Sequence, residues 1–138
     1  MSRTSDSHSD PAAAPAVDVR KLRTWLEQGA PVTVLDVRPA AERSEWSIPG
    51  SLHRDAYDAL RGGDPSALAD VTLPTDRPIV TVCARGRTSE IAAKLLRERG
   101  LDAYSLSGGM KAWSLAWNTA EIVNAQAALI QFRRTGKG

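Results

Sequence analysis

The sequence predicts an α/β protein in which helices flank a doubly wound, mostly parallel sheet of four to five strands. Short runs rich in Val, Ile and Thr, at residues 32–37 and 78–82, are apolar on both faces, as strands buried in a parallel sheet are. Segments with helical periodicity alternate with these runs, which favours parallel strands joined by helical crossovers. The chain has 138 residues, of which 42% are hydrophobic, so it can bury one core.

The chain divides into three parts by composition. Residues 1–16 are rich in Ser, Asp, Ala and Pro and have no hydrophobic period, which predicts a disordered leader. Hydrophobic periodicity then continues to residue 117, which predicts one folded domain over residues 17–117. Residues 118–138 follow the last predicted helix as a C-terminal extension or linker.

The first half of the domain contains two helical and two extended segments. Asp18 is suited to cap a helix whose apolar residues begin at Leu22 and recur three and four positions later. The turn residues Gly29 and Pro31 end this helix. Beyond the buried strand we expect a helix at 40–46, a turn at 48–50 and a short strand at 51–53.

The second half begins with a weaker pattern. A helix is expected at 55–61, and the Gly and Pro residues at 62–65 break it. The strand at 78–82 is the clearest in the chain and delivers Cys83 at its carboxyl end. The remaining predicted elements are a helix at 89–99, a strand at 104–106 and a helix at 110–117.

The net charge of +2 comes from 18 basic and 16 acidic residues, and the excess lies at one end of the chain. Arg133, Arg134 and Lys137 fall within the last six residues, so the rest of the chain is nearly neutral. Because no basic stretch is interleaved with aromatic residues, we expect no nucleic-acid partner. The sequence also lacks the ~18 consecutive apolar residues of a membrane helix and a secretory signal, so we expect no membrane partner and a cytoplasmic location.

Cys83 is the only cysteine in the sequence, and the two histidines are His8 and His53. One cysteine cannot form an internal disulfide, and a Cys/His zinc site needs more ligands than these. We therefore expect no metal and no cofactor. Cys83 is then either a small buried hydrophobe, the commoner role of a cysteine after a buried strand, or a reactive thiol.

The segment after Cys83 favours the reactive thiol. Gly86 allows a positive φ, so that successive main-chain N–H groups can turn inward around one atom. The following helix adds its N-terminal N–H groups, and two arginines add positive charge. These groups favour a negative sulfur, or a bound oxyanion such as a sulfonate. The predicted substrate-binding residues are Ala84, Arg85, Gly86, Arg87, Thr88 and Ser89.

Several motifs together carry a resemblance to a known family. The segment 83–88 resembles the active-site loop of rhodanese-type sulfurtransferases, in which glycine stands three residues after the cysteine. Residues 106–113 match the family's L-x-G-G-x-x-A-W ending. The match extends over residues 17–117, and the sequence is identified as similar to single-domain rhodanese-like proteins. Upstream, further family elements are matched by Asp36-Val37-Arg38, Glu42 and Ile48-Pro49-Gly50.

The resemblance implies transfer of a sulfane sulfur. The Cys83 thiolate would take the outer sulfur of thiosulfate or another small donor, become a persulfide, and pass that sulfur to cyanide or a thiol. Because the chain has no second cysteine, the acceptor must come from outside. The alternative is a non-catalytic module that carries persulfide for a partner or serves as a docking domain.

The upstream family elements include Asp36, Arg38 and Glu42. We interpret these three as an ion-paired network that fixes the first buried strand and its loop, the alternative being contact with substrate. Phosphatases and arsenate reductases of the same fold place an arginine six positions after the cysteine, where this chain has Ser89. A phosphoryl-transfer function therefore lacks its bidentate arginine.

The end of the chain carries a second resemblance. Residues 114–120 and the final R-R-T-G-K-G look like the junction in proteins where a rhodanese domain precedes a metallo-β-lactamase-fold domain. This resemblance implies a metallo-β-lactamase-fold partner domain. The alternative is a terminal helix or a frayed end.

Overall fold

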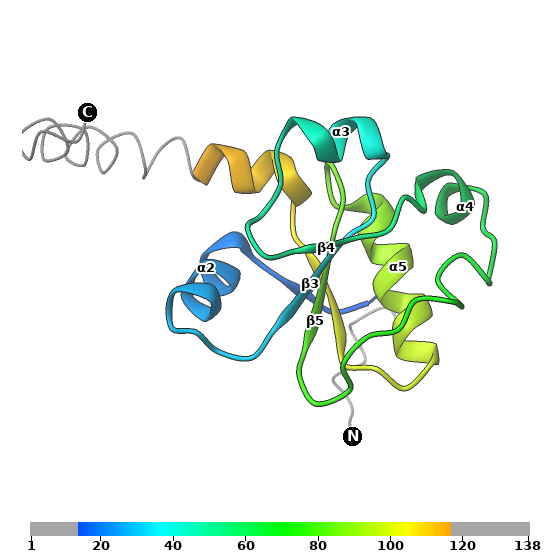
Figure 1. Ribbon diagram of the computed structural model, residues 1–138, viewed down its shortest axis with the longest axis horizontal. Helices are drawn as coiled ribbons and strands as arrows, with labels where there is room; N and C mark the ends of the chain where they lie inside the picture. Colours follow the sequence, from blue (N-terminus) through cyan, green and yellow to red (C-terminus); the bar gives the residue numbers. More distant parts are fainter. Residues whose placement is uncertain (1–13, 117–138) are drawn as a thin grey trace, which may run out of the picture.

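The computed structural model describes residues 14–116 and contains a five-stranded sheet in which every pairing is parallel (Figure 1). The predicted fold class is therefore confirmed, and the sheet is parallel throughout rather than mostly so. The strand order is β2-β6-β5-β3-β4. In this order the strands are β2 (Ala16–Val17), β6 (Ala103–Leu106), β5 (Ile79–Val82), β3 (Thr33–Asp36) and β4 (Leu52–His53).

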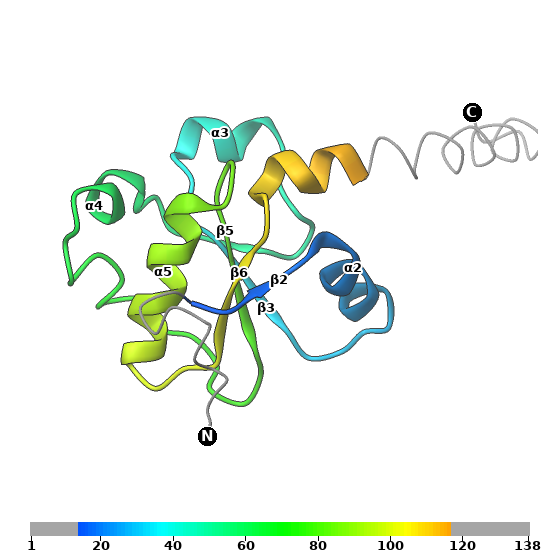
Figure 2. The ribbon, with the colours of Figure 1, turned by 180° about the vertical axis from the view of Figure 1, so that it is seen from behind.

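Helices cover both faces of this sheet. Figures 1 and 2 show α2 and α5 on opposite sides of the central strands. Residues 109–116 form a last helical segment that packs on the same core as α2. The other helices are α2 (Val19–Glu27), α3 (Ala40–Glu45), α4 (Tyr57–Arg61) and α5 (Arg87–Glu98).

The alternation of side chains along β5 divides the interior into two cores. Ile79 and Cys83 belong to the cluster on the side of α4 and α5, whereas Val80 and Val82 belong to the cluster on the side of α2. All of these side chains are at most 3% exposed, as expected for a central strand with helices on both faces. Cys83 therefore leaves the sheet toward the face that α5 covers.

Local signals explain where the predicted elements lie. Asp18 caps α2 by accepting a hydrogen bond from the Lys21 main-chain N–H at 2.8 Å, and Gly29, with φ of +68°, follows the end of the helix. The predicted strands at 32–37, 51–53, 78–82 and 104–106 are all present within about one residue of their expected bounds.

Three boundaries differ from the sequence prediction. The helix α4 begins at Tyr57 rather than at residue 55. The strand β2 starts inside the segment predicted as a leader, because Ser105 donates its main-chain N–H to the Pro15 carbonyl and Ser107 donates to the Val17 carbonyl. A strand of two residues has no periodicity to detect, so only its partner β6 reveals it. The helix α5 begins at Arg87 rather than at residue 89, because Gly86, with φ of +102°, turns the chain into the helix at once.

The predictions for residues 1–13 and 117–138 lie outside the described residues, and the metallo-β-lactamase-fold partner stays a prediction. Within residues 14–116, no helix is long and apolar enough to cross a membrane.

Candidate active site

The Cys83 sulfur receives main-chain hydrogen bonds at the carboxyl end of β5. The N–H groups of Gly86 and Ser89 lie 3.0 and 3.2 Å from Sγ. Gly86 adopts a positive φ, which turns its N–H inward, and the first turn of α5 brings the N–H of Ser89 to the same atom. Two N–H donors aimed at one sulfur stabilise negative charge on it. The expected turn of main-chain N–H groups toward the Cys83 sulfur is thus present, and its role in binding a ligand stays a prediction.

Buried hydroxyl groups lie behind the sulfur. The Oγ of Ser89 is 3.4 Å from the Cys83 Sγ, and it is 2.8 Å from the Oγ of Ser105 on β6. Thr81 on β5 donates its hydroxyl to the Ser89 carbonyl at 2.7 Å, which ties the first turn of α5 to the sheet. All three hydroxyl residues are at most 1% exposed, and each hydroxyl has a hydrogen-bond partner, as buried polar groups require.

The start of the last helical segment clamps the other side of the loop. Met110 and Lys111 donate their main-chain N–H groups to the carbonyls of Cys83 and Ala84, at 2.7 and 2.9 Å. Gly109 allows this approach, because a Cβ atom at this position would overlap the Cys83 carbonyl oxygen and its own φ is +62°. The G-G pair of the sequence therefore serves close packing against the cysteine loop.

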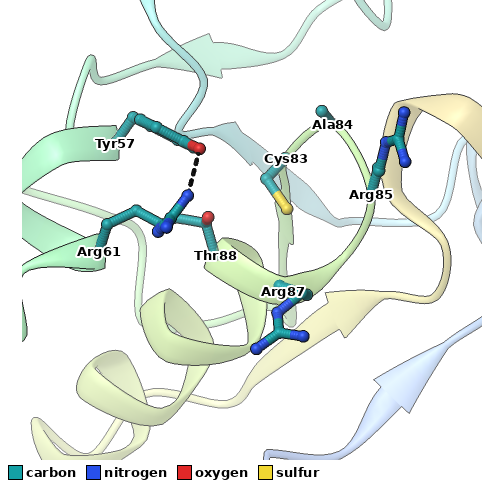
Figure 3. A pocket seen from close by; sticks show the side chains of 7 residues that line it. All are labelled: Tyr57, Arg61, Cys83, Ala84, Arg85, Arg87 and Thr88. Atoms are coloured by element: carbon teal, nitrogen blue, oxygen red, sulfur yellow. Dashed lines mark hydrogen bonds between the residues drawn. The ribbon is translucent and has the colours of Figure 1, made fainter.

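A cavity of about 320 Å³ opens above the Cys83 sulfur. It lies outside the carboxyl ends of the strands, where parallel sheets bind their ligands. Figure 3 shows the sulfur inside the curve of the loop, with the Arg85 and Arg87 guanidinium groups pointing away from it. Cys83 is 3% exposed, so the cavity gives limited access to this atom. The lining residues are Tyr57, Arg61, Cys83, Ala84, Arg85, Arg87 and Thr88.

The charges around this cavity are not balanced by carboxylates. None of the three arginines that line it, Arg61, Arg85 and Arg87, forms an ion pair with another described residue. By contrast, an aspartate or glutamate lies within ion-pair distance of Arg23, Arg38, Arg43, Arg54, Arg77 and Arg97. A concave site with unpaired guanidinium groups favours an anionic ligand.

A buried ion network lies at the end of the neighbouring strand β3. Arg38 binds the Asp36 carboxylate with two nitrogens, Nε at 2.9 Å from Oδ1 and Nη2 at 2.7 Å from Oδ2. Arg43 adds a third contact, with its Nη1 at 3.4 Å from the Asp36 Oδ2 and 2.7 Å from the Ser51 Oγ. Asp36 and Arg38 are at most 4% exposed, so the ion pair expected between them is present and buried, and its purely structural role stays a prediction.

Glu42 is the exception among the predicted network residues. Its side chain forms no hydrogen bond or ion pair with another residue of the 14–116 segment, and Arg43 takes the expected third position. Glu42 lies in the first turn of the six-residue helix α3, and the side chain that reaches Asp36 from this helix is the one that follows it. The contacts of Arg43 to Asp36 and Ser51 come from the structure alone.

The comparison with known families agrees with the geometry. The model of the rhodanese-like domain matches residues 18–116, which is nearly all of the described chain. The chain belongs to the rhodanese-like domain family.

Two curated relatives show how this rhodanese-like domain is used elsewhere. Thiosulfate sulfurtransferase GlpE of Pseudomonas savastanoi pv. phaseolicola is 39% identical over 88 residues, which cover 63% of this chain and 74% of that protein. tRNA sulfurtransferase of Desulfurococcus amylolyticus is 34% identical over 77 residues, which cover 56% of this chain but only 14% of that protein. The chain is thus similar to most of the first relative and to a small part of the second.

A solved structure supports the same assignment. The rhodanese-related protein from Thermoplasma volcanium has a TM-score of 0.61 and 25% sequence identity, over 74% of this chain and 92% of that one. Its extent agrees with a rhodanese-like domain of the single-domain type.

Within this domain, the predicted loop residues take different positions. The cavity is lined by Ala84, Arg85, Arg87 and Thr88. Gly86 and Ser89 instead contact the Cys83 sulfur through their main-chain N–H groups. Ser89 stands where a phosphatase would need an arginine, and it is fully buried. Among residues 14–116, no group of three or more His, Cys, Asp or Glu side chains could hold a metal ion.

Sequence reasoning did not identify two of the cavity residues, Tyr57 and Arg61. Both belong to the short helix α4, whose Arg61 Nη1 donates to the Tyr57 hydroxyl at 2.7 Å. Their separation of four residues on a predicted helix places them on one face, which is a usable signal. The weak pattern around this helix hid the signal, because it did not indicate that α4 lies beside the cysteine loop.

Proposed function

We propose that this rhodanese-like domain is a sulfurtransferase that moves a sulfane sulfur through a persulfide on Cys83. The observation that carries the proposal is the Cys83 Sγ, which receives two main-chain N–H groups at the base of a cavity lined by unpaired arginines. A hydrogen-bonded sulfur suits a thiolate nucleophile, and the arginines suit an anionic donor such as thiosulfate.

The first half of the reaction loads the cysteine. The Cys83 thiolate attacks the outer sulfur of thiosulfate, a new S–S bond forms, and the bond between the two donor sulfurs breaks. The electron pair of that bond leaves with sulfite. The product is a persulfide anion, whose terminal sulfur occupies the cavity beyond the loop. No further redox partner is needed, because thiosulfate is itself the oxidant of Cys83 and leaves as sulfite.

The second half returns the thiolate. A thiophilic nucleophile, cyanide or a small thiol, attacks the terminal sulfur of the persulfide, and the electron pair of the broken S–S bond returns to the Cys83 sulfur. With cyanide the product is thiocyanate. Because the sequence contains one cysteine, the acceptor is a second molecule.

The relatives support this proposal to different extents. GlpE is named as a thiosulfate sulfurtransferase, and its matched region includes most of its length. The tRNA sulfurtransferase is much longer than the matched region, so the substrate of that whole protein is not transferred to this chain. A domain of this size within a longer protein also suits the alternative function, in which Cys83 carries sulfur for a partner.

Intact-protein mass spectrometry after incubation with thiosulfate tests the proposal. We expect the mass to rise by one sulfur atom, sulfite to be released in equal amount, and cyanide to remove the added sulfur as thiocyanate. Cys83→Ser is the control and should stay unloaded while it keeps the wild-type unfolding curve.

The outcomes also separate the alternatives. A persulfide carrier would load but pass its sulfur slowly to cyanide and to small thiols. A docking domain would not load at all, and that result would overturn the proposal.

A further inference from the structure

We infer that Arg61, held in place by Tyr57, is the residue that selects an anionic sulfur donor. The inference deepens the proposed function, on which it rests, and it assigns donor recognition to α4 rather than to the arginines of the cysteine loop. Figure 3 shows the Arg61 guanidinium beside the Tyr57 hydroxyl on the wall of the cavity that contains the Cys83 sulfur.

The Tyr57 side chain restricts where the Arg61 guanidinium can lie. The Arg61 Nη1 donates to the Tyr57 hydroxyl at 2.7 Å, and the guanidinium carbon is 5.5 Å from the centre of the Tyr57 ring. A long exposed side chain normally loses conformational entropy when it binds a ligand. Tyr57 reduces that loss, because the guanidinium is already held in the cavity wall.

Arg61 keeps most of its donors for a ligand. Apart from the bond to Tyr57, it forms no hydrogen bond or ion pair with any residue between 14 and 116. Glu90 lines an adjoining hollow together with Arg61, but it does not come within ion-pair distance. A guanidinium fork without a carboxylate partner matches the oxygens of a sulfonate group.

The loop arginines are less suited to this task. All three cavity arginines are exposed, but Figure 3 shows the Arg85 and Arg87 guanidinium groups pointing away from the sulfur. Their charges attract anions to this face of the molecule, an effect that solvent and salt screen. Arg61 lies across the Cys83 sulfur from Arg85 in Figure 3, where it can contact the end of a donor whose outer sulfur meets Cys83.

The chemistry of the donor explains why the contact would matter. The negative charge on the sulfonate end of thiosulfate grows as sulfite leaves, so a guanidinium beside it stabilises the transition state more than the bound donor. A persulfide donor with an uncharged hydroxyethyl group also transfers a sulfane sulfur, but it has no sulfonate group for Arg61 to bind. The ratio of rates with the two donors therefore isolates the role of Arg61.

Arg61→Gln tests the inference through kcat/KM for loading of Cys83 by thiosulfate and by 2-hydroxyethyl persulfide. We expect the value for thiosulfate to fall about 10- to 100-fold, as for loss of a charge-assisted hydrogen bond, and the value for the persulfide to change less than about twofold. Arg61→Lys should recover part of the loss, since it restores the charge without the fork.

Two further variants serve as comparisons. Arg20 is an exposed arginine of α2 that forms no ion pair with a described residue. Arg20→Gln should leave kcat/KM unchanged for both donors. Arg85→Gln should reduce thiosulfate use only about two- to threefold, and added salt should abolish that difference.

Tyr57→Phe tests the positioning role. It keeps the ring, removes the hydroxyl, and should lower the thiosulfate to persulfide ratio by about threefold. In the double variant Tyr57→Phe/Arg61→Gln, the ratio should equal that of Arg61→Gln alone, because Tyr57 acts through Arg61. A Tyr57 that only stabilised α4 would instead slow both donors equally.

The result that would overturn the inference is equal loss with both donors, or no loss with thiosulfate, in Arg61→Gln. Either result would leave the proposed function standing, provided that the wild-type protein loads sulfur from either donor. If the wild-type protein loads from neither donor, the proposed function fails first and the role of Arg61 fails with it.

Discussion

Two clusters of arginines lie at the carboxyl edge of the sheet, and they differ in what neutralises them. In the closed network, Arg38 and Arg43 share the Asp36 carboxylate. In the open cavity, the arginines at positions 61, 85 and 87 have no carboxylate within ion-pair distance among the described residues. The cysteine loop lies at the same edge, because β5 pairs directly with β3.

The difference separates arginines that support the fold from arginines available to a ligand. A buried guanidinium must be paired to be tolerated, and Asp36 accepts three hydrogen bonds from the Arg38 side chain alone. The cavity arginines Arg61, Arg85 and Arg87 are exposed, so water can solvate them until an anion binds. The absence of a carboxylate partner, together with a place on the wall of the Cys83 cavity, therefore distinguishes the arginines available to a ligand.

Two arginines pack on tyrosine rings, and they too differ in whether a carboxylate neutralises the guanidinium. Arg97 lies 4.9 Å from the centre of the Tyr104 ring and also forms an ion pair with Asp102. A hydrogen bond to Asp102 raises the pKa of the Tyr104 hydroxyl above its usual value, with burial as a further cause. The Tyr57–Arg61 pair has similar geometry, but no acidic side chain between residues 14 and 116 forms an ion pair with Arg61. Its positive charge remains available to a ligand.

Breaking the closed network should give the largest effect. Asp36→Asn leaves the buried Arg38 without a counter-ion, so we expect the free energy of unfolding to fall by about 3–5 kcal/mol. Urea unfolding followed by circular dichroism measures this loss. Asp70→Asn is the control, because its pair with Arg54 is exposed and should contribute less than about 1 kcal/mol. Equal losses in the two variants would contradict the division into a closed network and an open cavity.

Changing the clamp on the cysteine loop should give the next largest effect. In Gly109→Ala the new Cβ would meet the Cys83 carbonyl and the Ala84 main chain, so we expect a loss of about 2–4 kcal/mol and slower loading of Cys83. The control is Gly50→Ala. Gly50 also has a positive φ, +79°, but a Cβ there meets no atom within 4 Å, so only the conformational strain remains. If Gly50→Ala destabilised the protein as much, close packing at Gly109 would not be the cause.

Two buried serines allow a smaller, matched test. The Ser105 hydroxyl contacts the Ser89 hydroxyl beside the Cys83 sulfur, whereas the Ser51 hydroxyl accepts from Arg43 in the closed network. Each alanine variant should lose about 1 kcal/mol of stability. Only Ser105→Ala should slow alkylation of Cys83 by iodoacetamide at neutral pH, by about 2- to 10-fold, because the Ser105 hydroxyl helps to hold Ser89, whose main-chain N–H donates to the Cys83 sulfur. If Ser51→Ala slowed alkylation as well, the cause would be the loss of overall stability rather than the contact between the Ser89 and Ser105 hydroxyls.

Most of the fold could be predicted from the sequence because the buried strands are continuous apolar runs. The strand at 78–82 and the cap at Asp18 are local signals, and both lie where they were expected. The edge strand β2 could not be found in this way, since two residues carry no period and their hydrogen bonds come from β6. The early start of α5 depends on the backbone angle of Gly86, which composition permits but does not specify.

The site was predictable where its residues are contiguous and was missed where they come from different elements. The loop from Cys83 to Ser89 is one segment, so its main-chain contacts follow from a glycine and a helix start. The direction of each arginine side chain does not follow from sequence position. Arg85 and Arg87 were expected beside the sulfur and point away from it, while Arg61 reaches the cavity from a helix more than twenty residues earlier in the chain.

The smallest expected change in the free energy of unfolding is that of a substitution at Glu42, the residue whose predicted contacts the structure does not contain. Glu42 was predicted to join the network, yet it makes no side-chain contact of that kind to a described residue, so Glu42→Gln should change the free energy of unfolding by less than about 0.5 kcal/mol. Arg43→Gln, one residue further along α3, should cost about 1–2 kcal/mol, because it removes bonds to Asp36 and Ser51. Urea unfolding of the two variants side by side decides which residue of α3 completes the closed network. A larger loss for Glu42→Gln would restore the original prediction and extend the network beyond Asp36, Arg38 and Arg43.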